Sequence, residues 1–258
     1  MHAAASSPGS VPVPGPSLST IPTPWKRLAV VLPAVFPLLV AAIALGTWLA
    51  LARTRSGSSD AWIGTWVAII APLGLWLLAV YLLARTRFYQ ARLAIPLGVI
   101  LIPAVGLLLL TRLPAMPDLL AATPTSWLVG LQVIRVVGGV FLLVWLSGEV
   151  RQPWFNLEAG TLDIIVGAAA LPIAWWLSST SAAAYSAAVA WNVLGLLDFV
   201  FAIAISATFR GAGPGTYIFS LRTPVVGAFK PTILGIVAFG VPLAIMLHML
   251  SLWQLLAT

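Results

Sequence analysis

Five polar side chains stand inside long apolar stretches of this sequence, and they are the residues best placed to carry chemistry. They are Gln132, Arg135, Asn192, Asp198 and His248. A charged group at the centre of a membrane helix costs roughly 2.5–3.5 kcal/mol on insertion scales, so it needs a partner. Arg135 is a permanent cation, Asp198 is an available counter-ion, and His248 has a side chain of the type that exchanges protons near neutral pH. The sequence therefore predicts a buried polar site within a membrane domain.

The composition is that of a membrane protein. Of the 258 residues, 61% are hydrophobic and only 7% are charged, whereas soluble domains carry about 25% charged residues. Cysteine is absent, which excludes disulfides, thiolate metal sites and cysteine catalysis. The net charge of +7 is compatible with nucleic-acid binding, but Lys and Arg stand beside the apolar runs, as topology signals do. We therefore expect the lipid bilayer as partner and no nucleic acid.

Seven apolar runs approach or exceed the length of about 20 residues with which a helix crosses a bilayer. A backbone without hydrogen-bond partners is too costly in lipid, so each run should be a helix. The fold class predicted is all-α, a bundle of seven transmembrane helices. The fifth run is the shortest and contains Pro172. The runs cover residues 28–51, 61–84, 93–112, 127–148, 161–178, 185–208 and 232–256.

The chain divides into a tail and one membrane domain. Residues 1–24 are rich in Pro and Ser and show no apolar period, which predicts a disordered tail. Residues 25–258 form a single transmembrane domain. The tail is not expected to be a cleaved signal peptide, because the basic pair comes late and the apolar run after it is too long.

The Lys and Arg residues between the runs indicate the orientation. Nine of them fall on the side of the N-terminal tail, and three fall on the other side: Arg53, Arg55 and Arg112. Positive residues are enriched on the cytoplasmic side of membrane proteins. We therefore predict a multi-pass protein of the plasma or inner membrane with a cytoplasmic N-terminus and an external C-terminus.

Arg135 and Asp198 both fall near the middle of the membrane and are the only opposite charges predicted there. We predict that they pair in a bidentate contact. Gln132, Asn192 and His248 fall toward the external side and would complete a pocket that opens outward. A buried ion pair can instead fix the packing of helices without carrying chemistry, so a structural and a functional role both stay open.

A second set of acidic residues, Glu149, Glu158 and Asp163, falls near the cytoplasmic ends of the fourth and fifth runs. They form a candidate cytoplasmic cluster. Helix-end charges are the more ordinary explanation, because a carboxylate is favoured at a helix N-terminus. Glu149 also falls on the helical stripe that contains Arg135 and Gly139.

No catalytic signature is present. The sequence contains no HExxH, GxSxG, Walker or GxGxxG motif. His248 has only His2 as a second histidine, which disfavours a bis-histidine haem site. We expect neither a metal nor a cofactor.

Four groups of residues carry a resemblance, over about residues 130–250. They are Gln132-x-x-Arg135-x-x-Gly138, Gly160-x-x-Asp163-Ile164-x-x-Gly167, Trp191-Asn192-x-x-Gly195-x-x-Asp198, and Pro242 with His248. In these groups the chain resembles uncharacterised bacterial membrane proteins with several spans. The resemblance implies a bacterial membrane protein and no particular activity.

Three functions follow from these expectations. The first is binding or transport of a small polar or anionic solute that meets Arg135, with Asp198 as counter-ion or proton acceptor. The second is a membrane-embedded enzyme for a lipid or quinone-like substrate, with Asp198 and His248 as acid and base. The third is a non-catalytic subunit or an assembly factor, in which protein side chains would fill the pocket. Its partner would be a membrane subunit or a second copy of the chain in a homo-oligomer.

Overall fold

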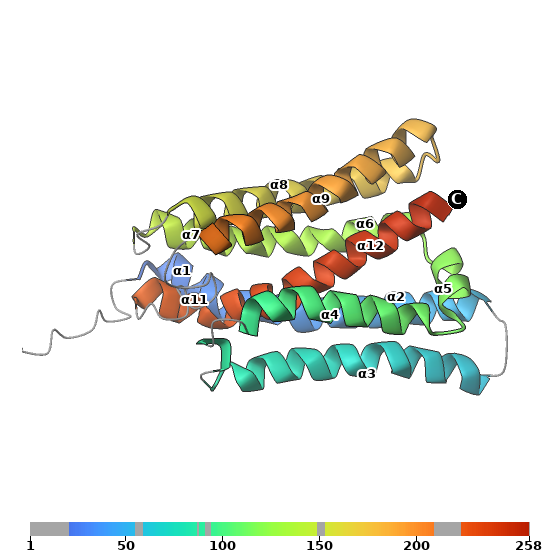
Figure 1. Cartoon of the computed structure of the whole chain (residues 1–258), viewed down its shortest axis with the longest axis horizontal. Helices are drawn as coiled ribbons and strands as arrows, with labels where there is room; N and C mark the ends of the chain where they lie inside the picture. Colours follow the sequence, from blue (N-terminus) through green and yellow to red (C-terminus); the bar gives the residue numbers. More distant parts are fainter. Residues whose placement is uncertain are drawn as a thin grey trace, which may run out of the picture.

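The protein is a bundle of helices that lie side by side along one axis (Figure 1). The computed structural model describes residues 21–54, 59–86, 88–90, 94–148, 153–208 and 223–257, and this part of the chain contains helices and no strand. Within these described residues, seven helices are long and apolar enough to cross a membrane, so the predicted all-α bundle of seven transmembrane helices is confirmed. The disordered tail predicted for residues 1–24 lies almost entirely outside the described residues.

The seven spans are built from more than seven helical segments, because three of the spans change helix type along their length. The first three spans contain α1 (Thr23–Val31), the 3₁₀ segment η2 (Leu32–Ala34), α2 (Val35–Thr54), α3 (Ser59–Leu83) and α4 (Ala94–Thr111), with the 3₁₀ turn η3 (Phe88–Gln90) before α4. The fourth contains α6 (Thr125–Gly130), η4 (Leu131–Gly138) and α7 (Gly139–Leu146), preceded by the short α5 (Met116–Ala122). The remainder are α8 (Pro153–Leu177), α9 (Ala182–Thr208) and the segments α11 (Pro224–Gly235), η5 (Ile236–Gly240) and α12 (Val241–Ala257).

Two spans begin earlier than the sequence indicated. Helix α8 starts at Pro153 rather than near residue 161, and α11 starts at Pro224 rather than near residue 232. The polar residues in these first turns lower the mean hydropathy, although the helix continues through them. The correction matters for the site, because it moves Asp163 from the end of a helix to its third turn.

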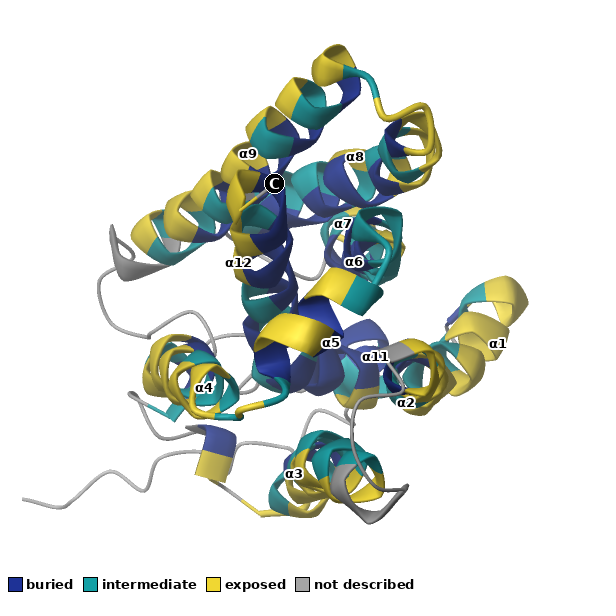
Figure 2. Cartoon of the chain, turned by 90° about the vertical axis from the view of Figure 1, so that its right-hand side faces the viewer, coloured by how far each residue is buried: buried dark blue, intermediate teal, exposed yellow. Residues whose placement is uncertain are grey.

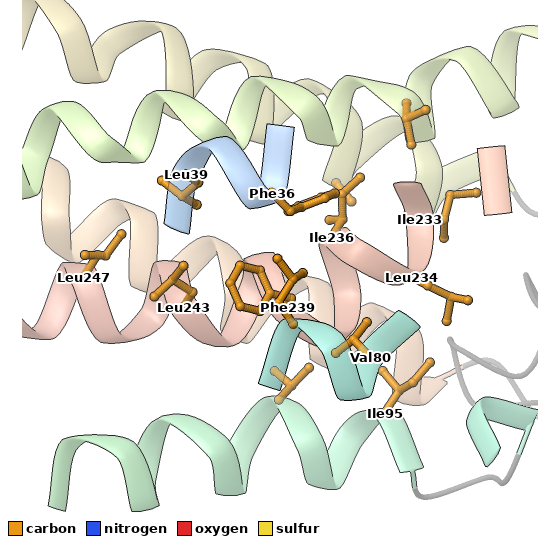
Figure 3. Close-up of a cluster of buried hydrophobic side chains, with 14 of the residues drawn as sticks. Phe36, Leu39, Val80, Ile95, Ile233, Leu234, Ile236, Phe239, Leu243 and Leu247 are labelled. Atoms are coloured by element: carbon orange, nitrogen blue, oxygen red, sulfur yellow. The ribbon is translucent and has the colours of Figure 1, made fainter. Parts of the chain in front are cut away.

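The last span is the centre of the bundle. Within its most apolar window 67% of residues are buried, against 17%, 11% and 17% in the first three spans. Seen from the end of the bundle, α12 runs between α4 on one side and α8 and α9 on the other (Figure 2). Figure 3 shows side chains of α11, η5 and α12 packed against Phe36, Leu39, Val80 and Ile95 from the first three spans.

Two segments near the middle of the bundle depart from α-helical geometry. Segment η4 is a 3₁₀ helix and η5 is a π-helix, and such departures inside long helices often occur at functional sites. With three residues per turn, η4 places Gln132, Arg135 and Gly138 on one buried face. The prediction from the sequence assumed α-helical spacing and therefore placed Gly139 on the face of Arg135. This placement is wrong, because the 3₁₀ segment has three residues per turn.

Candidate functional site

The Arg135 side chain lies in the core of the bundle, with 2% of its surface exposed. Its Nε donates to Asp163 Oδ1 at 2.9 Å, and one terminal nitrogen bridges Asp163 Oδ1 at 2.8 Å and Asp198 Oδ2. The other terminal nitrogen donates to the Gly195 carbonyl at 3.2 Å and lies 3.3 Å from His248 Nε2. The guanidinium, which carries five N–H groups, thus contacts four acceptor atoms from α8, α9 and α12.

The predicted pairing of Arg135 with Asp198 is confirmed, but the pairing is shared. Asp163 binds the same guanidinium. The prediction that Asp198 alone forms a bidentate contact with Arg135 is therefore wrong. Asp163 lies ten residues after Pro153, or about 15 Å along α8, which is half the thickness of the hydrocarbon core. The explanation of Asp163 as a helix-end charge is therefore wrong as well.

Close helix packing and an aromatic ring complete the surroundings of Arg135. A Cβ at Gly138 would collide with the Asp163 carboxyl, and a Cβ at Gly195 would collide with the His248 ring. The Phe199 ring centroid lies 4.2 Å from Arg135 Cζ, within range of a cation–π interaction. Only small residues therefore fit where α8 and α9 approach the guanidinium.

A second hydrogen-bonded chain leads away from Arg135 through His248. Because the guanidinium donates to Nε2, the imidazole is neutral and its proton lies on Nδ1. Nδ1 donates to Asn192 Oδ1 at 2.8 Å. The Asn192 amide in turn donates to the Ala188 carbonyl at 2.8 Å and to Ser251 Oγ at 3.1 Å. The hydrogen-bonding groups of His248 are thus all engaged.

The three residues expected to line an outward pocket are packed instead. Gln132, Asn192 and His248 are each fully buried, at 0% exposure. The Gln132 amide donates to the Ala244 carbonyl of α12 at 2.9 Å. These three side chains therefore connect helices within the core and do not face solvent in this structure.

Glu158, in the second turn of α8, brings a third carboxyl group to the cluster. Its carboxyl group is close enough to that of Asp198 for the two groups to interact electrostatically. Both of its oxygens and Asp198 Oδ1 are buried and receive no donor from the residues that the structure describes. Glu149, the remaining member of the predicted acidic set, lies outside the described residues. The cluster thus holds three carboxyl groups and one guanidinium.

A small cavity of about 20 Å³ adjoins the ion pair. Arg135 and Asp163 provide its polar lining, and Phe36 and Ile236 are among its apolar neighbours, while Asp198 and His248 do not line it. A cavity of this size accommodates about one water molecule. It is too small for an organic solute in this conformation.

The bundle and its charged core define a class: a multi-pass helical membrane protein with an ion-pair network at mid-membrane depth. The chain belongs to the family described as a domain of unknown function (DUF8737), which matches residues 92–256. The comparison with curated proteins finds no match, and neither does the comparison with solved structures. The matched segment runs from just before α4 nearly to the end of α12 and contains Arg135 and all of its polar contacts.

Proposed function

We propose that the protein is a membrane transport protein whose buried carboxyl pair, Glu158 and Asp198, binds and releases one proton. The observation that carries the proposal is the excess of carboxyl groups over cations in the core, together with buried Glu158 oxygens that no described residue donates to. Ionisable groups inside membrane helices commonly belong to proton relays and transport pathways.

The charges of the neighbouring groups favour one retained proton. Glu158 faces Asp198 and has Asp163 and Arg135 nearby, while His248 is neutral. If all three carboxyl groups were ionised, two negative charges would be uncompensated in a medium of low dielectric constant, which is costly. A proton on Glu158 removes one of these charges and allows Glu158 to donate a hydrogen bond to Asp198.

The same count of charges favours a neutral or cationic polar solute over an anionic one. Asp163 and Asp198 already neutralise Arg135, so an incoming anion would meet excess negative charge. The cavity beside Arg135 accommodates about one water molecule. Passage of a solute therefore requires the helices to move, and loss of the proton from Glu158 supplies a charge change that drives such motion.

A membrane-embedded enzyme that uses Asp198 and His248 as acid and base is less favoured. Both ring nitrogens of His248 are occupied, one by Arg135 and the other by Asn192. The guanidinium also stands between the carboxyl group and the imidazole, since its two terminal nitrogens bind one each. A proton transfer between these two groups would first require the ion pair to open.

Proton movement in reconstituted vesicles tests the proposal. With a pH gradient across the membrane and a pH-sensitive dye inside, we expect wild-type protein to release the gradient faster than protein-free vesicles do. Glu158→Gln and Asp198→Asn should abolish this release. Asp118→Asn, at an exposed carboxyl group of α5 outside the cluster, is the control and should behave as wild type. Undiminished proton release in folded Glu158→Gln protein would refute the proposal.

We also propose that the N-terminus lies in the cytoplasm of a bacterial cell and that the protein sits in its inner membrane. The support is the excess of Lys and Arg on the N-terminal side of the spans. In this orientation Glu158, near the start of α8, lies in the cytoplasmic half of the bilayer, and Asn192 and Ser251 lie in the external half.

A further inference from the structure

A long apolar cleft separates α3 from α4, away from the Arg135 cluster. Its volume is about 740 Å³, and its walls come from α3 around Pro72 and from α4 around Val105. Met246 and Leu250 of α12 form part of its floor. A cleft of this volume falls within the range of about 300–1,000 Å³ that is usual for small-molecule sites.

The arrangement of the helices keeps this cleft open. Helix α4 packs mainly on α12 and α3 packs mainly on α2 and α11, and both also contact η5. Figure 2 shows α3 and α4 as separate columns at the edge of the bundle. At Gly106 the backbone of α4 lies so near α12 that a Cβ would stand 2.7 Å from Met246 Cε. The floor of the cleft is therefore closely packed at this point.

Arg112, directly after the last residue of α4, is the one charged residue among the described residues that line the cleft. Its side chain is exposed and forms no ion pair with any described residue. From Leu101 to Arg112 the cleft follows α4 over about 16 Å, at 1.5 Å per residue. This length corresponds to about half of a 30 Å hydrocarbon core. The cleft thus has the depth of one leaflet and a cation at its rim.

We infer that this cleft binds one acyl chain of an anionic phospholipid, with the lipid phosphate on Arg112. The apolar walls exclude water from the chain and bury its surface. The guanidinium donates to phosphate oxygens in the fork geometry that suits them. The lipid differs from the general lipid layer around the protein because residues of α2, α3, α4 and α12 surround its chain and a charge holds its head group. This inference is independent of the proposed proton site.

Lipid retention measured by native mass spectrometry tests this inference. The purified protein is exchanged into nanodiscs that contain equal amounts of phosphatidylglycerol and phosphatidylcholine, and it is then released into mild detergent. We expect wild-type protein to retain one phosphatidylglycerol molecule. Arg112→Gln should reduce this retention about fivefold, since one basic residue at the membrane surface contributes about 1 kcal/mol to the binding of anionic lipid. Ala68→Trp, which fills the cleft from α3, should abolish retention of either lipid.

Two matched control variants distinguish lipid binding in the cleft from a general effect of lost charge or added bulk on the protein surface. Arg53→Gln removes a cation at the same end of the bundle that stacks on Trp127 and does not line this cleft. Ala71→Trp adds the same bulk to α3 at an exposed position outside the cleft lining. Both should retain the lipid as wild type does. Equal retention of the two lipids by wild type, or unchanged retention in Arg112→Gln and Ala68→Trp, would overturn the inference.

Discussion

The guanidinium of Arg135 joins four spans through acceptors that lie far apart in the sequence. Asp163 comes from α8, Gly195 and Asp198 come from α9, and His248 comes from α12. Removing one partner of a buried ion pair typically costs about 3–5 kcal/mol, because the remaining charge is left without compensation. The stability of the bundle and the charge state of its core therefore depend on the same side chain.

At the residue scale, Arg135→Ala should lower the free energy of unfolding by about 3–5 kcal/mol, because Asp163 and Asp198 lose their shared cation. Arg135→Lys should recover only part of this loss, since an ammonium group has three donors for the four acceptor atoms around Arg135. Thermal unfolding in detergent measures both effects. Arg53→Ala, which removes an exposed cation over Trp127, is the control with an expected loss below about 1 kcal/mol. An Arg135→Ala variant as stable as this control would contradict the account of the ion pair.

The sequence located Arg135 and Asp198 correctly because each falls near the middle of an apolar run, and depth alone brings them together. It placed Asp163 and Glu158 wrongly, because these residues lower the mean hydropathy and shifted the expected start of the fifth span. The sequence nonetheless contains a pattern that could have placed Asp163 inside the bundle. Gly160 and Gly167 flank Asp163 at helical spacing, which indicates a face of α8 that packs closely against another helix.

At the scale of elements, α8 approaches the fourth span through glycines. A Cβ at Gly167 would stand 2.7 Å from the backbone nitrogen of Val136, next to Arg135. Backbone atoms cannot move aside as the end of a side chain can, so a methyl group here would push the two helices apart.

We therefore expect Gly167→Ala to destabilise the protein by about 1–3 kcal/mol, which is the usual cost of an overpacked core. Gly64→Ala, in α3, adds the same methyl group where no atom lies within 4 Å, and it should leave the midpoint of unfolding unchanged or slightly raised. Thermal unfolding of the two variants side by side provides the comparison. Equal midpoints would show that the close approach of α8 has no energetic consequence.

The π-helical segment η5 is supported by a side chain from another span. Trp76 Nε1 donates to the Ala238 carbonyl at 3.0 Å, and the Trp76 ring packs against Phe239. Trp76→Phe should keep most of the packing and lose the hydrogen bond, at a cost of about 1 kcal/mol. Chemical or thermal unfolding measures this difference. A Trp76→Phe protein with wild-type stability would mean that the indole hydrogen bond contributes nothing to the π segment.

Hydropathy was sufficient to predict seven helical spans, because each span must be apolar over the thickness of the bilayer. It did not predict where those helices become 3₁₀ or π. The hydrogen bonds that accompany these changes come from distant spans, such as Trp76 to Ala238 and Gln132 to Ala244. A local sequence pattern contains no record of such contacts.

At the scale of the whole molecule, an odd number of spans places the two ends of the chain on opposite sides of the membrane. Figure 1 shows α1 at one end of the bundle and the C-terminus at the other. The chain has no native cysteine, so labelling of a single introduced cysteine shows on which side of the membrane that position lies. We predict that a membrane-impermeant maleimide labels Ser179→Cys in intact cells and labels Thr86→Cys only after the cells are opened. The reverse pattern would invert the proposed orientation.

The bundle surrounds its charged core with apolar helices, and the central claim is that this core retains a proton between Glu158 and Asp198. Infrared spectroscopy of the carboxyl stretch, recorded near neutral pH, tests this claim most directly because protonated and ionised carboxyl groups absorb at separate frequencies. We predict a band from one buried protonated carboxyl group in wild type and in Asp118→Asn, and its absence in Glu158→Gln. A wild-type spectrum without that band, or a band that persists in folded Glu158→Gln protein, would contradict the account.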